Sequence, residues 1–205
     1  MKKFEKIILK AANDNHSRHK ISRATIAPDK HPVVNAIKKN KIKSKKLLEI
    51  GCSTGFVLKK ISSLTNAKCY GIDASRKAIN DGKKLFKDIK LFHGLIEESK
   101  LKKEKFDLII LGFFLFLMPP NKILDLFNIV DNMLKINGQI IIYDMHNIGF
   151  KKKNYKHNIN LSTFRWDFKN VFLSLPYYKL VHKKIDRYKK SNDKTEISIL
   201  RKVKI

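Results

Sequence analysis

The sequence predicts an α/β fold in which short strands alternate with helices around a mostly parallel sheet. Three observations support this class. Apolar strand patterns and helical patterns alternate between residues 46 and 144. A tight turn from Gly51 to Gly55 joins the first strand directly to a helix, as βαβ units require. Residues 177–188 and 195–203 alternate polar and apolar side chains and read as a closing hairpin.

The elements follow one another in a regular order. The turn is preceded by the apolar strand Leu47-Leu48 and followed by a helical pattern of four apolar residues, namely Phe56, Leu58, Ile61 and Leu64. The next elements are a strand from Ala67 to Ile72 that ends in Asp73, a helix from Ser75 to Phe86 with Ser75 as N-cap, a strand from Ile89 to His93, a strand from Phe106 to Leu111, a helix from Pro120 to Leu134 and a strand from Ile140 to Tyr143. Residues 145–162 are expected to form a loop, and residues 164–173 a short aromatic helix.

The chain of 205 residues suits one domain with a sizeable core. We expect a helical N-terminal segment at residues 1–45 and the main domain at residues 46–205. The N-terminal segment includes a helix from Pro32 to Lys39, and Ser22 to His31 form either part of a lid or a plain surface segment.

Composition limits the partners and the compartment. The longest apolar run, Leu108 to Met118, is too short to cross a bilayer, which needs ~20 residues, so no membrane partner is expected. Cys52 and Cys69 lack metal-ligand spacing, and no metal is predicted. Few cysteines and no convincing signal peptide predict a cytoplasmic protein.

The net charge of +27 suggests nucleic-acid binding at first sight. However, only six of the 45 basic residues are arginine, the better side chain for phosphate and base-edge contacts. An AT-rich genome that biases codons toward lysine explains the charge at least as well. A nucleic-acid partner is therefore an open alternative that we do not favour.

The glycine turn and Asp73 together predict an adenosine site. Gly51 and Gly55 let the backbone approach a ligand closely, and Asp73 is placed to accept hydrogen bonds from ribose hydroxyls. The spacing is G-x-S-x-G, and Phe56 stands where a dinucleotide site needs its third glycine. No Gly-Lys-Ser/Thr follows the turn, so a phosphate P-loop is also excluded.

Residues 49–55, Glu-Ile-Gly-Cys-Ser-Thr-Gly, resemble motif I of the class I S-adenosylmethionine-dependent methyltransferases, with Ser53 in place of the middle glycine. The Phe106-Asp107 pair resembles the start of that family's fourth strand, and residues 134–139 resemble its "LKPGG" turn. The resemblance covers residues 46–144. It implies a single Rossmann-like domain with a seven-stranded sheet of order 3-2-1-4-5-7-6, an antiparallel strand 7 and helices on both faces.

The resemblance also implies S-adenosyl-L-methionine as the cofactor. The residues expected to bind it are Glu49, Gly51, Cys52, Ser53, Gly55, Asp73, Ala74, Leu95, Ile96 and Leu111. Leu95 occupies the place of an acidic residue that often contacts the adenine amino group in this family. The adenine therefore rests on Leu95 and Ile96 through backbone contacts, or Glu97 substitutes for the missing acid.

Methyl transfer to a hydroxyl or ammonium group needs a base within hydrogen-bond reach. His146, just past the fifth strand, is the candidate base, with Asp144 as its orienting group; a loop histidine without a chemical role is equally compatible with the sequence. Phe150, Arg165 and Trp166 are candidates for contacts with the acceptor, and Arg165 suits a carboxylate or phosphate.

The leading prediction is a methyltransferase that acts on oxygen or nitrogen of a small molecule, for example a sugar or surface-glycan precursor. The alternative is an RNA or protein methyltransferase that uses the lysine-rich surface. A third interpretation, a non-catalytic adenosine-binding protein, fits less well because Glu49, Gly51, Gly55 and Asp73 are all present. Neither the methylated atom nor the oligomeric state follows from the sequence.

Overall fold

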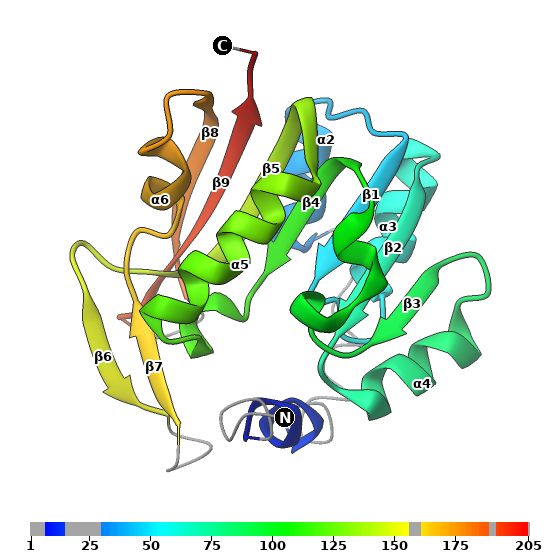
Figure 1. Ribbon diagram of the computed structural model, residues 1–205, viewed down its shortest axis with the longest axis horizontal. Helices are drawn as coiled ribbons and strands as arrows, with labels where there is room; N and C mark the ends of the chain where they lie inside the picture. The colour runs from blue at the N-terminus through cyan, green and yellow to red at the C-terminus, as the bar shows by residue number, and fades with distance from the viewer. Residues whose placement is uncertain (1–6, 15–29, 156–160, 189–191, 205) are drawn as a thin grey trace. The chain divides into compact units, whose positions relative to one another are not determined.

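A computed structural model describes residues 7–14, 30–155, 161–188 and 192–204 (Figure 1). Most of the predicted lid segment, residues 22–31, lies outside these ranges. The chain forms two compact units, Met1–Leu101 and Lys102–Ile205. In the described residues no helix has the length and apolar character needed to cross a membrane.

Seven strands form the main sheet, in the order β3-β2-β1-β4-β5-β9-β8. These strands are β1 (Lys46–Ile50), β2 (Lys68–Asp73), β3 (Lys90–His93), β4 (Phe106–Gly112), β5 (Leu134–His146), β8 (Tyr178–Arg187) and β9 (Lys194–Lys202). Two further strands, β6 (Lys151–Asn154) and β7 (Ser162–Arg165), form a separate two-stranded sheet within the described residues. With that hairpin set aside, the order is the predicted 3-2-1-4-5-7-6. The seventh strand, β9, is antiparallel to β5, which confirms the predicted fold class.

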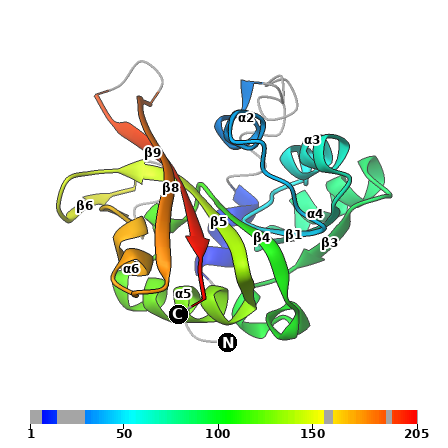
Figure 2. The same cartoon turned by 90° about the horizontal axis from the view of Figure 1, so that it is seen from above.

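The first unit is built on three parallel strands, β1, β2 and β3. Their connections are α3 (Phe56–Thr65), which packs against β2, and α4 (Arg76–Leu85), which packs against β2 and β3. The predicted helix at Pro32 is α2 (Pro32–Lys39), which packs against α3 (Figure 2). Ser75 caps α4 as predicted, because its hydroxyl accepts a hydrogen bond from the Ala78 N–H at 3.1 Å.

The second unit contains β4, which is parallel to β5, and the antiparallel strands β9 and β8. Its helices are α5 (Pro120–Met133) and the short α6 (Lys169–Leu173), which pack against each other (Figure 1). Phe127 of α5 stacks on Phe172 of α6 with ring centroids 4.5 Å apart, and both rings are buried. β4 and β9 are buried over almost their whole length, so the core of this unit lies on both faces of its sheet.

Three predicted boundaries were wrong. The expected turn at residues 134–139 belongs to β5, although Asn137 has a φ of 63° and the pairing with β4 shifts between Phe106 and Leu108. The expected loop at residues 145–162 contains β6, which is built largely from exposed lysines that give no apolar alternation. The expected aromatic helix is shorter than predicted, because Phe164 and Arg165 belong to β7 and the helix begins only at Lys169.

Candidate functional site

The glycine turn after β1 adopts the backbone geometry that its sequence predicts. Gly51 and Gly55 both have a φ of 79°, in the region that favours glycine. The N–H groups of Gly51 and Cys52 donate to the carbonyl of Ile72 at 2.9 and 3.2 Å. The turn is therefore tied to the end of β2. Ser53, at the place of the middle glycine, also has a positive φ of 52°, which is uncommon for a residue with a side chain.

Asp73 connects the glycine turn to the start of α4. One carboxylate oxygen accepts the N–H of Ser53 and the other accepts the N–H of Ser75, both at 2.7 Å. Asp73 thus ties the glycine turn to the start of α4.

Glu49 is a buried carboxyl group directly before the turn. Its Oε2 has no hydrogen-bond partner within the described ranges. Burial, and secondarily the charge of Asp73, raises the pKa of Glu49 to about 8. Burial likewise raises the pKa of the Cys52 thiol well above its usual value, so Cys52 is an inert packing group. An unpaired buried acceptor beside a glycine turn is suited to a ligand that carries a hydrogen-bond donor.

The remaining predicted cofactor residues are divided between the two units. Ala74 and Leu95 are half-buried near the ends of β2 and β3, and Ile96 is buried at the start of a 3₁₀ turn, Ile96–Glu98. The N–H of Gly94 donates to the carbonyl of Asp73 at 3.0 Å, which places this segment next to Asp73. Leu111 is buried near the end of β4 in the second unit.

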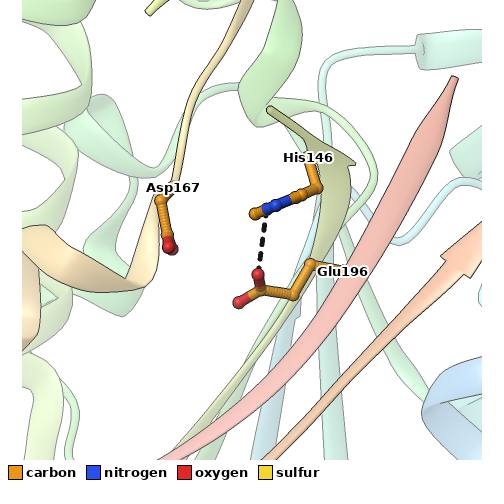
Figure 3. A group of neighbouring side chains, drawn as sticks. All are labelled: His146, Asp167 and Glu196. Carbon is orange, nitrogen blue, oxygen red and sulfur yellow. Dashed lines mark ion pairs between the residues drawn. The ribbon is translucent and has the colours of Figure 1, made fainter. Parts of the chain in front are cut away.

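In the second unit, His146 lies at the end of β5 beside Glu196 of β9. Its Nδ1 is 2.9 Å from Oε2 of Glu196, and the two side chains face each other (Figure 3). Both residues are only 8% exposed. The contact lacks hydrogen-bond alignment in this conformation, and neither atom has another hydrogen-bond partner among the described residues. The pair is therefore buried and has unused hydrogen-bonding capacity.

Glu196 is held by two donors on its other oxygen. Lys169 of α6 approaches Oε1 at 3.1 Å, and the Ser198 hydroxyl donates to the same atom. Lys169 in turn donates to Asp167. His146, Asp167 and Glu196 bring potential metal-ligand atoms within 4.8 Å of one another (Figure 3). The buried ammonium of Lys169 already supplies a positive charge to both carboxylates, which makes a metal ion unnecessary for their charge balance.

Asp144 does not serve as the orienting group of His146 in this structure. Its two carboxylate oxygens accept the N–H groups of Leu115 and Met145, each at 2.7 Å. Burial raises the pKa of Asp144 to about 7, even though these backbone donors act in the opposite direction. Asp144 therefore holds the segment after β4, and the carboxylate beside His146 is Glu196.

Two of the three predicted acceptor-contact residues lie together, and the third is already paired. The rings of Phe150 and Trp166 meet edge to face with centroids 5.9 Å apart, and Phe150 is 55% exposed. Arg165 donates to Asp193, so its charge is already matched within the protein. Trp166 also lines a small pocket that has room for about one water molecule. The other residues that line this pocket are Ile142, Asp144, Met145, His146, Phe168, Lys169 and Glu196.

An aromatic cluster follows β4, in a segment that we expect to help build the acceptor pocket. Phe113 has a φ of 56°, a strained conformation for a bulky residue. Its ring packs against Tyr143 at 5.2 Å, Phe116 at 5.5 Å and Tyr188 at 5.4 Å between centroids. Such strain persists only when the surrounding contacts impose it, and it is often found at ligand sites.

Comparisons with known proteins agree with this architecture. Residues 47–138 match the family model described as "Methyltransferase domain". The fold is similar to 1,6-didemethyltoxoflavin-N1-methyltransferase of Burkholderia thailandensis, at 12% identity and a TM-score of 0.73, over 95% of this chain and 88% of that one. It is also similar to the N-methyltransferase NodS of Bradyrhizobium japonicum, at 16% identity and a TM-score of 0.62, over 86% and 99% of the two chains.

A third structure, described as a DhpI–SAH complex, is 13% identical with a TM-score of 0.62, over 96% of this chain and 97% of that one. No curated protein sequence matches significantly. The family match and the sheet order define an α/β methyltransferase domain. Residues 47–138 therefore match a methyltransferase domain, and the chain has the fold of the solved methyltransferase structures named here.

Proposed function

We propose that this protein transfers a methyl group from S-adenosylmethionine to an oxygen or nitrogen atom of a small molecule. The observation that carries this proposal is the buried His146, which faces a carboxylate in a pocket lined by Trp166 and Phe168. A base and aromatic walls suit an acceptor whose nucleophile must lose a proton.

The first unit provides groups that fit the cofactor. Asp73 follows β2 beside the glycine turn, where its carboxylate is placed to accept from ribose hydroxyls, and Glu49 offers an unpaired buried oxygen to a donor such as an ammonium group. When bound, S-adenosylmethionine supplies a methyl group that its sulfonium already activates. The residues proposed to hold it are Glu49, Gly51, Cys52, Ser53, Gly55, Asp73, Ala74, Leu95, Ile96 and Leu111.

The protein's task is then placement and proton removal. The acceptor atom must lie ~3 Å from the methyl carbon, with the bond that breaks on the opposite side. His146 would take the proton from the acceptor, while Phe150 and Trp166 would contact its apolar part. One of the similar structures named above, the Burkholderia thailandensis methyltransferase, contains bound 1,6-didemethyltoxoflavin, which supports a small acceptor. Sugar and surface-glycan precursors remain within the proposed class.

An RNA or protein methyltransferase is the second candidate, and one observation favours it. The exposed lysines Lys151, Lys152 and Lys153 of β6 and Lys179, Lys183 and Lys184 of β8 concentrate positive charge in the second unit. Binding through them would weaken steeply as salt rises. For the compartment we propose the cytoplasm, because both cysteines are buried free thiols.

Calorimetric titration of the purified, nucleic-acid-free protein tests the proposal first. We expect micromolar binding of S-adenosylmethionine and S-adenosylhomocysteine and no binding of NAD. An acceptor screen should then show turnover with small hydroxy or amino compounds, starting with nucleotide-linked sugars and heteroaromatic compounds. Turnover only with RNA or protein, in a salt-dependent manner, would replace the small-molecule assignment with the second candidate.

Asp73→Ala should weaken binding of S-adenosylhomocysteine by ~1–3 kcal/mol, because charge-assisted hydrogen bonds to the ribose are lost. Calorimetry measures the effect. The matched control is Asp88→Ala, since Asp88 is an exposed carboxylate of the same unit that pairs with Lys59 at 2.7 Å. Unchanged affinity in Asp73→Ala would remove Asp73 from the cofactor site.

His146→Ala should lower the turnover number ~10²–10⁴-fold, the usual range for loss of a general base, while leaving the affinity for S-adenosylhomocysteine unchanged. His182→Ala, a half-exposed histidine of β8, serves as the control. Turnover and cofactor affinity would fall together if His146 were only a packing residue. That result would contradict its role as the base.

A further inference from the structure

We propose that Glu196 is a positioning residue that holds the His146 imidazole in the tautomer able to accept a proton from the substrate. The proposal rests on the function assigned to His146 above. In a neutral imidazole one nitrogen carries the proton and the other accepts one, and a neighbouring acceptor decides which. A carboxylate beside Nδ1 selects the form protonated at Nδ1, which leaves Nε2 free to act as the base.

The two oxygens of Glu196 have different environments, and this difference determines which oxygen faces His146. Oε1 is occupied by two donors, the ammonium of Lys169 at 3.1 Å and the hydroxyl of Ser198. Oε2 lies 2.9 Å from Nδ1 of His146 (Figure 3). Because Oε1 is fixed by Lys169 and Ser198, the carboxylate cannot turn without giving up those contacts. The oxygen presented to His146 is therefore held in place, and the proposal requires the imidazole ring to turn into hydrogen-bond alignment with it.

Burial makes this contact strong enough to matter. Glu196 and His146 are each 8% exposed and Lys169 is 5% exposed, so water screens their interactions poorly. Asp167 accepts a hydrogen bond from Lys169 and anchors the ammonium from its other side. The exposed Lys183 also approaches the Glu196 carboxylate, at 3.7 Å from Oε2, but its side chain is 38% exposed. Lys183 is therefore a control position: it carries a positive charge near Glu196 but is not buried with the His146–Glu196 pair.

The chemical step balances with these groups alone. The acceptor O–H or N–H gives its proton to Nε2 of His146, and the acceptor lone pair forms the bond to the methyl carbon. The bond between carbon and sulfonium sulfur breaks, and its electron pair stays on sulfur as the neutral thioether of S-adenosylhomocysteine. Glu196 faces the imidazolium that forms, as the carboxylate of a catalytic triad does.

Glu196→Gln tests the proposal because the change is isosteric. The Lys169 ammonium can only donate, so the amide carbonyl should turn toward it and the amide NH₂ toward Nδ1 of His146. The imidazole would then be protonated at Nε2, the form that cannot accept the substrate proton. Nitrogen-15 NMR of histidine-labelled protein at mildly alkaline pH reads the tautomer directly, and His146→Ala assigns the signals.

We expect the Nδ1–H tautomer in the unmodified protein and in Lys183→Ala, and the Nε2–H tautomer in Glu196→Gln. With an accepted substrate, Glu196→Gln should lower the turnover number ~10²–10⁴-fold and leave cofactor affinity unchanged. The Nε2–H tautomer in the unmodified protein would overturn the proposal, and so would an unchanged tautomer in Glu196→Gln. Stoichiometric binding of Mg²⁺ or Zn²⁺ to the His146 ring would also overturn it, in favour of a metal site.

The NMR readout separates this proposal from the proposed function, since it needs no acceptor. A protein without small-molecule activity can still show the predicted tautomers. Conversely, loss of turnover in His146→Ala with an unchanged tautomer in Glu196→Gln would leave the base in place and remove only the role of Glu196.

Discussion

Gly82→Ala is expected to displace the glycine turn from its native geometry and to abolish measurable cofactor binding. Gly82 lies in α4 where that helix crosses the turn, and a Cβ atom there would be 2.3 Å from the carbonyl oxygen of Thr54. It would also lie 2.7 Å from Leu91 Cδ1. Backbone atoms cannot move aside as a side chain does, so either the turn or the helix must shift.

The direction of the change in stability is informative, because alanine in a helix is normally ~1 kcal/mol more favourable than glycine. A stabilised protein would therefore contradict the contact between α4 and Thr54. We expect instead a loss of several kcal/mol in the free energy of unfolding, typical of overpacking against rigid backbone. Urea unfolding and calorimetry with S-adenosylhomocysteine measure both effects, and Asn80→Ala, an exposed position in the same helix, is the control.

Glu49→Gln is expected to remove a pH dependence from the stability of the protein. The pKa of Glu49 is about 8 in the folded chain, against an ordinary value of 4.5. Between these values the folded chain holds a proton that the unfolded chain has lost. The free energy of unfolding therefore falls as pH rises through this window, by as much as ~1.4 kcal/mol per pH unit.

Below pH 4.5 the ionisation of Glu49 should add no difference in the free energy of unfolding between the protein and the variant. At pH 8 the variant should be the more stable. Urea unfolding across this range measures the slope without any ligand. Glu98→Gln, which alters an exposed carboxyl of the same unit, should leave the slope unchanged. Equal slopes in the protein and in Glu49→Gln would show that Glu49 is ionised in the folded state.

The fold could be predicted because its signals are local. The turn at Gly51, the N-cap at Ser75 and the apolar runs of β4 and β5 each mark an element within a few residues. The hairpin of β6 and β7 could not be predicted in this way. Three successive lysines in β6 give no alternation, and their pairing with β7 depends on contacts between the two strands.

The candidate site could be predicted only where one segment carries it. The cofactor residues follow a contiguous motif, whereas the partner of His146 comes from a strand fifty residues later. The polar residues Glu196 and Ser198 share one face of the buried strand β9, and that break in an apolar pattern was the available signal. Lys169 gave none, because a lysine in a basic chain does not stand out from the sequence.

The outer strand of the sheet has a consequence for how copies of this protein meet. β8 is the last strand in the sheet order, and Leu180, Val181 and Ile185 are exposed along it. Such an edge can pair with another chain, but here lysines are interleaved with the apolar residues. Two like-charged edges repel each other, and salt screens that repulsion. The lysine-rich composition thus opposes edge-to-edge association of two copies, and this effect weakens as the ionic strength rises.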